Sequence, residues 1–208
     1  MVEFNAASIL ALVCTVQVTN AIPLSTPEPS SISKVNWKTV TFGEAYPGAL
    51  VDGKPIGPDT VLYRIIPDDV AATVSAKGDA NELEKRDTLS CYKRGNQVLK
   101  SQVQNAKNIF CNHAQAANPS NGNTFAESWD WYPLSNGNWV RFTDQNSNLR
   151  SVWFWIKVNN GFVFNWNNCF DAFWSVINQC PTNNAQSFGG SLKGAKNGQV
   201  EVSFDVVD

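Results

Sequence analysis

Two stretches of the chain repeat apolar residues at the three- and four-residue steps of an amphipathic helix. The first, residues 101–117, carries one apolar stripe and ends at Asn118-Pro119: Val103, Ala106, Phe110, Ala114 and Ala117. The second, residues 169–180, carries a cleaner stripe: Cys169, Ala172, Phe173, Val176, Ile177 and Cys180. Asn167 or Asn168 can cap its start, and Pro181 follows its end. The pattern predicts two helices.

Short segments rich in β-branched and aromatic residues surround the helices. They are residues 89–93, 124–132, 139–143, 151–158, 187–192 and 199–207. In residues 151–158, apolar side chains alternate with Trp153, Trp155 and Lys157, as expected of a strand with two different faces. An Asn-Gly turn at Asn197-Gly198 predicts a hairpin of the last two strands. The order β-α-β-β-β-α-β-β predicts an α+β fold, with two amphipathic helices packed on one antiparallel sheet as a two-layer sandwich.

Composition changes at the dibasic pair Lys85-Arg86. Seven of the eight tryptophans, four of the five cysteines and the single histidine follow it. Residues 1–21 have the short apolar run and small terminal residue of a signal peptide. We expect residues 22–86 to be a propeptide, with strand-like pieces at 38–42 and 60–66, removed by an endoprotease at Lys85-Arg86. The mature secreted domain is then residues 87–208.

Two alternatives concern this processing site. Lys85-Arg86 can be only a solvated charge pair on the surface. A second pair, Lys93-Arg94, also follows the dibasic pattern, but cutting there discards Cys91 and leaves one cysteine unpaired. The even cysteine count therefore favours Lys85-Arg86.

The charge of the mature part excludes some partners. Residues 87–208 hold nine Lys/Arg and eight Asp/Glu, a difference of one, and so have no basic footprint for nucleic acid. Nothing after the leader approaches the run of roughly 18 apolar residues that a membrane helix needs. We expect an extracellular protein without an integral membrane segment.

Cys91, Cys111, Cys169 and Cys180 predict two disulfides in an exported chain. No CxxC occurs and only one histidine is present, so we expect neither a metal nor another cofactor. Cys169 and Cys180 are about 16 Å apart along one helix, too far to pair. Two pairings remain. If both helices run in the same sense, Cys91 pairs with Cys169 and Cys111 with Cys180.

Three stretches carry a resemblance to a known group of proteins. They are residues 91–95, residues 106–111 (AKNIFC), and residues 169–180 with Phe188-Gly189-Gly190 behind them (CFDAFWSVINQC…FGG). Together with the dibasic propeptide, they make residues 88–206 similar to small cysteine-containing secreted effector and killer-toxin-like proteins of fungi. The resemblance implies an α/β sandwich and extracellular action on a host or competitor. It implies no catalytic motif.

Candidate catalytic residues are few. His113 is the only side chain suited to acid–base work near neutral pH, and its helix position is also typical of a half-buried structural histidine. Glu127 and Asp130 are expected on opposite faces of a strand, so they make no glycosidase pair. Gly189-Gly190 suits a bulge or turn before the last strand. We therefore expect no enzyme, and the hydrolase alternative would use His113 with Glu127 or Asp171.

The tryptophans are the remaining candidates for function. The interpretation that we favour is a binding surface that engages a host or competitor protein: Trp129, Trp131, Trp153, Trp155 and Trp174. The same indoles can instead stack on sugars of a cell-wall glycan. The structural alternative is that a loop, the N-terminal end of the chain or a second copy covers them.

Overall fold

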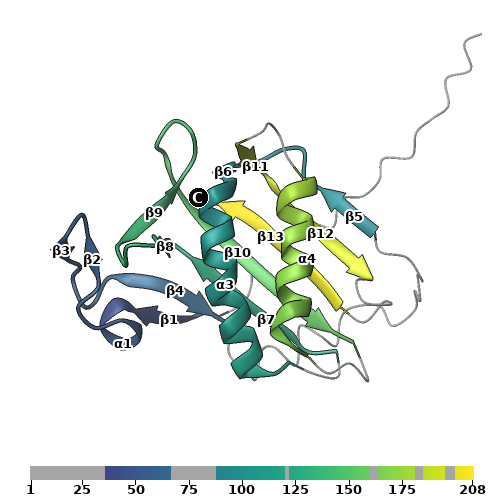
Figure 1. Cartoon of the computed structure of the whole chain (residues 1–208), viewed down its shortest axis with the longest axis horizontal. Coiled ribbons are helices and arrows are strands. Elements are labelled where there is room, and N and C mark those ends of the chain that lie inside the picture. The colour runs from purple at the N-terminus through teal and green to yellow at the C-terminus, as the bar shows by residue number, and fades with distance from the viewer. Residues whose placement is uncertain (1–35, 67–87, 120–121, 160–163, 181–184, 195–199) are drawn as a thin grey trace, which may run out of the picture.

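The computed structural model describes residues 36–66, 88–119, 122–159, 164–180, 185–194 and 200–208 (Figure 1). The predicted signal peptide and the pair Lys85-Arg86 lie outside the described residues. Part of the predicted propeptide, residues 36–66, lies within them.

A nine-stranded antiparallel sheet forms the body of the molecule. Its main path, in spatial order, is β1 (Lys38–Thr41), β4 (Val61–Ile65), β7 (Thr124–Trp129), β10 (Leu149–Val158), β13 (Val200–Val207), β12 (Gly189–Gly194) and β5 (Thr88–Cys91). The strands β8 (Trp131–Pro133) and β9 (Trp139–Thr143) branch from β10. This confirms a mixed α/β fold with a mostly antiparallel sheet. The sheet has more strands than expected, because β1 and β4 belong to it and the expected strand 124–132 is divided into β7 and β8.

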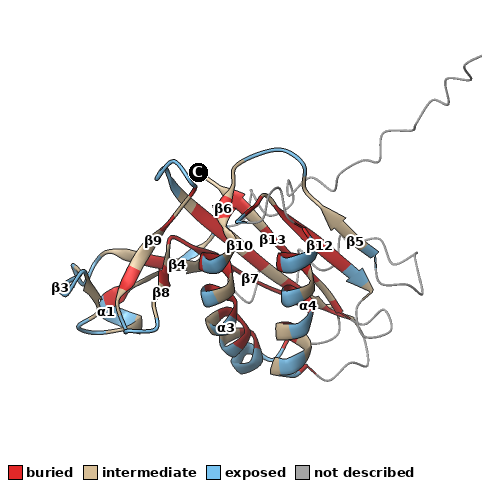
Figure 2. Ribbon diagram, turned by 45° about the horizontal axis from the view of Figure 1, so that its top comes forward, coloured by how far each residue is buried: buried red, intermediate tan, exposed pale blue. Residues whose placement is uncertain are grey.

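The helices α3 (Lys100–Ala117) and α4 (Trp166–Gln179) lie on the same face of the sheet (Figure 1). Asn165, rather than Asn167 or Asn168, caps α4 by accepting a hydrogen bond from the Asn168 backbone N–H at 3.0 Å. Asn118 ends α3 in the left-handed conformation, φ 47°, and its N–H donates to the Ala114 carbonyl. Both helices bury the sides that face the sheet and expose their outer faces (Figure 2).

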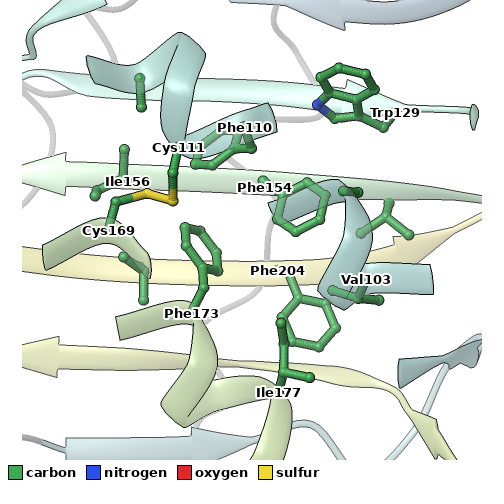
Figure 3. Close-up of a cluster of buried hydrophobic side chains, with 14 of the residues drawn as sticks. Val103, Phe110, Cys111, Trp129, Phe154, Ile156, Cys169, Phe173, Ile177 and Phe204 are labelled. Carbon is green, nitrogen blue, oxygen red and sulfur yellow. A yellow bond between two sulfur atoms is a disulfide. The ribbon is translucent and has the colours of Figure 1, made fainter. Parts of the chain in front are cut away.

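The core fills the space between these helices and β10 and β13 (Figure 3). The Phe110 ring stacks on Phe154 at 5.3 Å and meets Phe173 edge-on at 5.3 Å. The expected alternation along β10 is confirmed: four apolar side chains, Val152, Phe154, Ile156 and Val158, are fully buried, whereas Trp153, Trp155 and Lys157 are half-buried.

The disulfides are Cys91–Cys180 and Cys111–Cys169, with Cα atoms 5.0 and 5.8 Å apart. The expected pairing of Cys91 with Cys169 was therefore wrong. Three successive antiparallel pairings separate β5 from β10, so these two strands run in opposite senses. The helix that follows each strand inherits this difference, and α3 and α4 are antiparallel. Cys111 in the second half of α3 thus faces Cys169 near the start of α4.

Gly189 and Gly190 start β12 rather than forming a separate turn. Gly189 has φ +101°, and a Cβ atom on it would lie 2.2 Å from the Phe204 carbonyl oxygen. A Cβ atom on Gly190 would lie 2.8 Å from the Cys180 sulfur. Small residues are required here because β13 and one disulfide approach the backbone closely.

Residues 36–66 add a small unit to the β7 edge of the sheet. β1 and β4 pair with each other, and the Tyr63 position of β4 lies opposite Trp129 of β7. Between them come the short helix α1 (Phe42–Ala45) and the hairpin of β2 (Leu50–Val51) and β3 (Lys54–Pro55). A further small sheet pairs β6 (Val98–Leu99) with β11 (Gln186–Ser187). Within the described ranges, no helix is long and apolar enough to cross a membrane.

Candidate functional site

The five tryptophans expected to form one surface lie in three places. Trp129 pairs across from Val152, and Glu127 across from Phe154, which puts both on the helix-facing side of the sheet. Trp153 pairs across from Ser128 and therefore points to the other side. Trp174 is on α4. One continuous surface cannot contain all of them.

The first place is the covered cluster, which we define as Trp129, Trp131 and Trp139 with Phe42, Tyr46 and Tyr63. The Trp129 side chain is fully buried, and the Tyr63 ring stacks on it at 4.4 Å. Phe42 meets Trp131 and Trp139 edge-on at 5.4 and 5.5 Å. Phe42, Tyr46 and Tyr63 come from residues 36–66, while His113 and Trp139, from later in the chain, also stack on Trp129. Trp129 therefore belongs to the core of the described chain, not to a binding surface.

A histidine–carboxylate pair lies next to this cluster. His113 Nδ1 is 2.8 Å from Glu127 Oε1, and the Trp129 indole N–H donates to Glu127 Oε2 at 2.9 Å. Burial raises the pKa of the Glu127 carboxyl, and the hydrogen bond and charge of His113 oppose that rise. The structure thus brings together two of the residues named for the hydrolase alternative.

The surroundings of the pair limit its chemistry. The Tyr63 ring lies 5.3 Å from the His113 ring, and Trp129 stacks on the imidazole at 5.7 Å. Burial raises the pKa of Tyr63 to about 12, so this phenol stays neutral in ordinary conditions. General acid–base work needs a reacting group within hydrogen-bond reach of the imidazole. With β4 in place, aromatic rings pack against that imidazole.

The other carboxylates expected near this region have separate partners. Asp130 accepts from Arg64 Nη1 at 3.3 Å and from Ser151 Oγ at 2.6 Å. Asp171 is exposed on α4 and lies on a different element from His113. The bonds to Arg64 and Ser151 indicate a structural role for Asp130 at the β7–β8 bend.

The second place is the α4 ladder, which we define as Trp166, Phe170 and Trp174. Their rings stack in sequence, with centroids 4.8 and 6.0 Å apart and the last two planes only 8° from parallel. The Trp174 side chain is 46% exposed. An i, i+4, i+8 repeat places three side chains along one side of a helix, so the ladder presents one ring to solvent and supports it with two others.

Lys107 of α3 reaches across to this ladder. Its Nζ lies 3.5 Å from the centre of the Phe170 ring and 5.2 Å from that of Trp174, and it donates to Asn108 Oδ1 at 3.0 Å. Burial lowers the pKa of the Lys107 amine to about 8. A cation over aromatic faces is held electrostatically, so Lys107 fixes the position of the ladder against α3.

The third place is the sheet face opposite the helices. Trp153 and Trp155 are half-buried there, and Trp37 packs against Trp153 with ring centroids 5.5 Å apart. The residues opposite Trp155 on the two neighbouring strands, Ala126 of β7 and Ser203 of β13, are small. Residues from the N-terminal part of the described chain therefore contact both tryptophans: Tyr63 stacks on the fully buried Trp129, and Trp37 packs against the half-buried Trp153.

A polar hollow of about 230 Å³ lies between the Asp144 turn and Gln186. Asp144 accepts hydrogen bonds from the Asn146 and Asn148 backbones and forms an ion pair with Arg150 at 2.9 Å. The hydrogen bond from the Asn148 side chain is the main cause that lowers the Asp144 pKa. These bonds hold the turn that forms one side of the hollow.

Sequence reasoning singled out Trp174 but missed Trp166, Phe170 and Lys107. The signal for the first two was present as a four-residue repeat of aromatic residues from 166 to 174. Among the described residues, no group of three or more His, Cys, Asp or Glu is placed to hold a metal ion. Comparison with known protein families, characterised proteins and solved structures gave no match for this chain.

Proposed function

We propose that this chain is exported, cut after Lys85-Arg86, and acts outside the cell as an effector or toxin-like protein that binds a target of a host or competitor. Residues 87–208 then form the two-layer α/β sandwich that carries the binding surface. The two disulfides support this setting, because such bonds form and persist in oxidising compartments.

The observation that carries the proposal is the exposed indole of Trp174 at the end of the α4 ladder. Exposed tryptophans are frequent energetic centres of protein interfaces, since one rigid ring buries a large area at a small cost in conformational entropy. The stack beneath Trp174 holds the ring before any partner arrives. We assign target binding to this surface and no catalytic step to the protein.

A matched pair of variants tests the assignment. Leu149 is the other exposed large apolar side chain among the described residues, at 55%, and it lies on a different element, at the start of β10. Fluorescently labelled full-length protein is applied to a panel of plant, fungal and bacterial cells. We expect Trp174→Ala to lose surface binding by about tenfold or more, and Leu149→Ala to retain it. Equal binding by both variants would reject the α4 ladder as the site.

A glycan-binding role is the second candidate, and the surroundings of Trp174 favour it. The exposed residues Asp171, Asn178 and Gln179 are on the same helix, and sugars combine a stacking face with hydroxyls that such groups bind. Retention on insoluble chitin or β-glucan distinguishes the two candidates. Trp174-dependent retention would favour the glycan, and retention that depends on Trp153 would place the site on the other sheet face.

A further inference from the structure

Residues 36–66 are joined to the rest of the fold along the edge of β7. Tyr63, Arg64 and Ile65 pair with three residues of β7, and the bonding continues past both ends of the ladder. The Ile66 N–H donates to the Ala126 carbonyl at 3.1 Å, and the Asp130 N–H donates to the Leu62 carbonyl at 3.2 Å. This bonding uses backbone groups of β7 that would otherwise form an open sheet edge.

Apolar side chains of residues 36–66 also pack against the rest of the fold. Phe42, Leu62 and Ile66 are 1%, 0% and 3% exposed, values typical of a domain core rather than of a loosely attached arm. Tyr46 packs on Trp139 with ring centroids 4.8 Å apart. The segment and the domain therefore share one hydrophobic core.

Polar contacts fix the register of this arrangement. Arg64 forms an ion pair with Asp130, and the backbone of Leu50 forms an isolated parallel β-bridge with Asn138, next to β9. Residues 36–66 thus contact both β7 and the β8–β9 hairpin. The attachment is non-covalent apart from the peptide chain, since both disulfides lie between residues 91 and 180.

We propose that residues 36–66 remain bound to residues 88–208 as a second, non-covalent chain after the connection between them is cut. The segment then still covers the edge of β7 in the processed protein, and the covered cluster stays buried there. Whether this two-chain form occurs naturally depends on the proposed processing at Lys85-Arg86. The strength of the interface does not depend on that processing, because it can be tested with an engineered cut.

The experiment uses the full chain with a recognition site for a site-specific protease placed at residues 83–86. The secreted protein is cut after both disulfides have formed, and its fragments are followed by size-exclusion chromatography with native mass spectrometry. We expect a one-to-one complex of the two fragments at low micromolar concentration. Separate elution of the N-terminal fragment without denaturant would overturn the proposal, and this test needs no substitution in the core.

Two variants of the same cut protein sharpen the result. Phe42→Ala removes a fully buried ring, and we expect the dissociation constant of the fragments to rise about a hundredfold or more. Lys54→Ala, on the exposed β3 hairpin, is the matched control and should leave it unchanged. An unchanged constant for Phe42→Ala would also overturn the proposal. If the natural chain is never cut, the processing is rejected, while the engineered cut still decides the interface.

Discussion

The covered cluster and the α4 ladder contain similar side chains in opposite situations. The rings of the cluster come from α1, β4, β7, β8 and β9, elements up to about 100 residues apart in the chain, and they enclose Trp129 completely. The rings of the ladder all come from one helix, and the last of them faces solvent. Aromatic density along a chain therefore does not indicate exposure. Exposure depends on whether a distant segment completes the sheet beside the ring.

The largest expected effect separates the two regions by stability. Trp129→Ala removes a buried ring together with its hydrogen bond to Glu127, and we expect a loss of about 3–5 kcal/mol in the free energy of unfolding. Trp174→Ala should cost about 1 kcal/mol or less, because its ring is already half in water. Chemical denaturation of both variants measures the difference. Similar losses would mean that the two regions do not differ in burial.

A smaller effect is expected where the covered cluster meets its buried carboxylate. His113→Ala leaves Glu127 without its closest partner, and we expect a cost of about 1–3 kcal/mol at pH 7. The loss of His113 removes an influence that lowers the Glu127 pKa, so the folded-state pKa rises further above the unfolded value. A carboxyl whose pKa is higher in the folded state lowers the stability fully at pH values above that folded-state pKa. The cost disappears below the unfolded-state pKa of about 4.3, where the carboxyl is protonated in both states.

Denaturation of His113→Ala across pH 4 to 8 measures this dependence. The gap from the parent protein should narrow as the pH falls. A gap that stays constant would show that Glu127 is not buried as described.

The ion pair that ties the N-terminal segment to the β7–β8 bend should contribute less. Arg64 is partly exposed, and we expect Arg64→Ala to cost about 1 kcal/mol or less. Lys54→Ala on the neighbouring β3 serves as the control for loss of a positive charge, with no measurable effect expected. Thermal unfolding at low and high salt checks the origin of the loss. Screening by salt should reduce the difference between the Arg64 variant and the parent.

The last prediction sharpens the α4 ladder and concerns titration rather than stability. The Lys107 amine should titrate at about 8, because burial between α3 and the ladder disfavours its charged form. In Trp174→Ala the amine gains access to water, and its pKa should move back toward 10.5. Side-chain NMR of the lysine signals measures both. A Lys107 midpoint near 10.5 in the parent protein would contradict the burial of this amine.

Local periodicity predicted the parts of the fold that depend on neighbours along the chain. The stripe from Cys169 to Ile177 is buried on α4, and Phe154 and Ile156 face the core from β10. The disulfide pairing could not be reached in this way. It depends on the relative direction of β5 and β10, which is set by strand pairings far apart in the sequence.

The candidate site shows the same division. The repeat of Trp166, Phe170 and Trp174 is local and is visible in the sequence. The burial of Trp129 follows from the pairing of β7 with β4, a strand about 65 residues earlier, within a segment expected to be removed. No local pattern around Trp129 carries that information, because Tyr63, the ring that stacks on it at 4.4 Å, lies on the other strand.

Exchange of the indole N–H protons with solvent tests the contrast between the two regions most directly. The Trp129 proton is bonded to Glu127 in a fully buried site, so its NMR signal should persist for hours in D₂O. The Trp174 signal should vanish within the dead time of the experiment, and single Trp→Phe variants assign both. A slowly exchanging Trp174 or a rapidly exchanging Trp129 would contradict the division into a covered cluster and an open ladder.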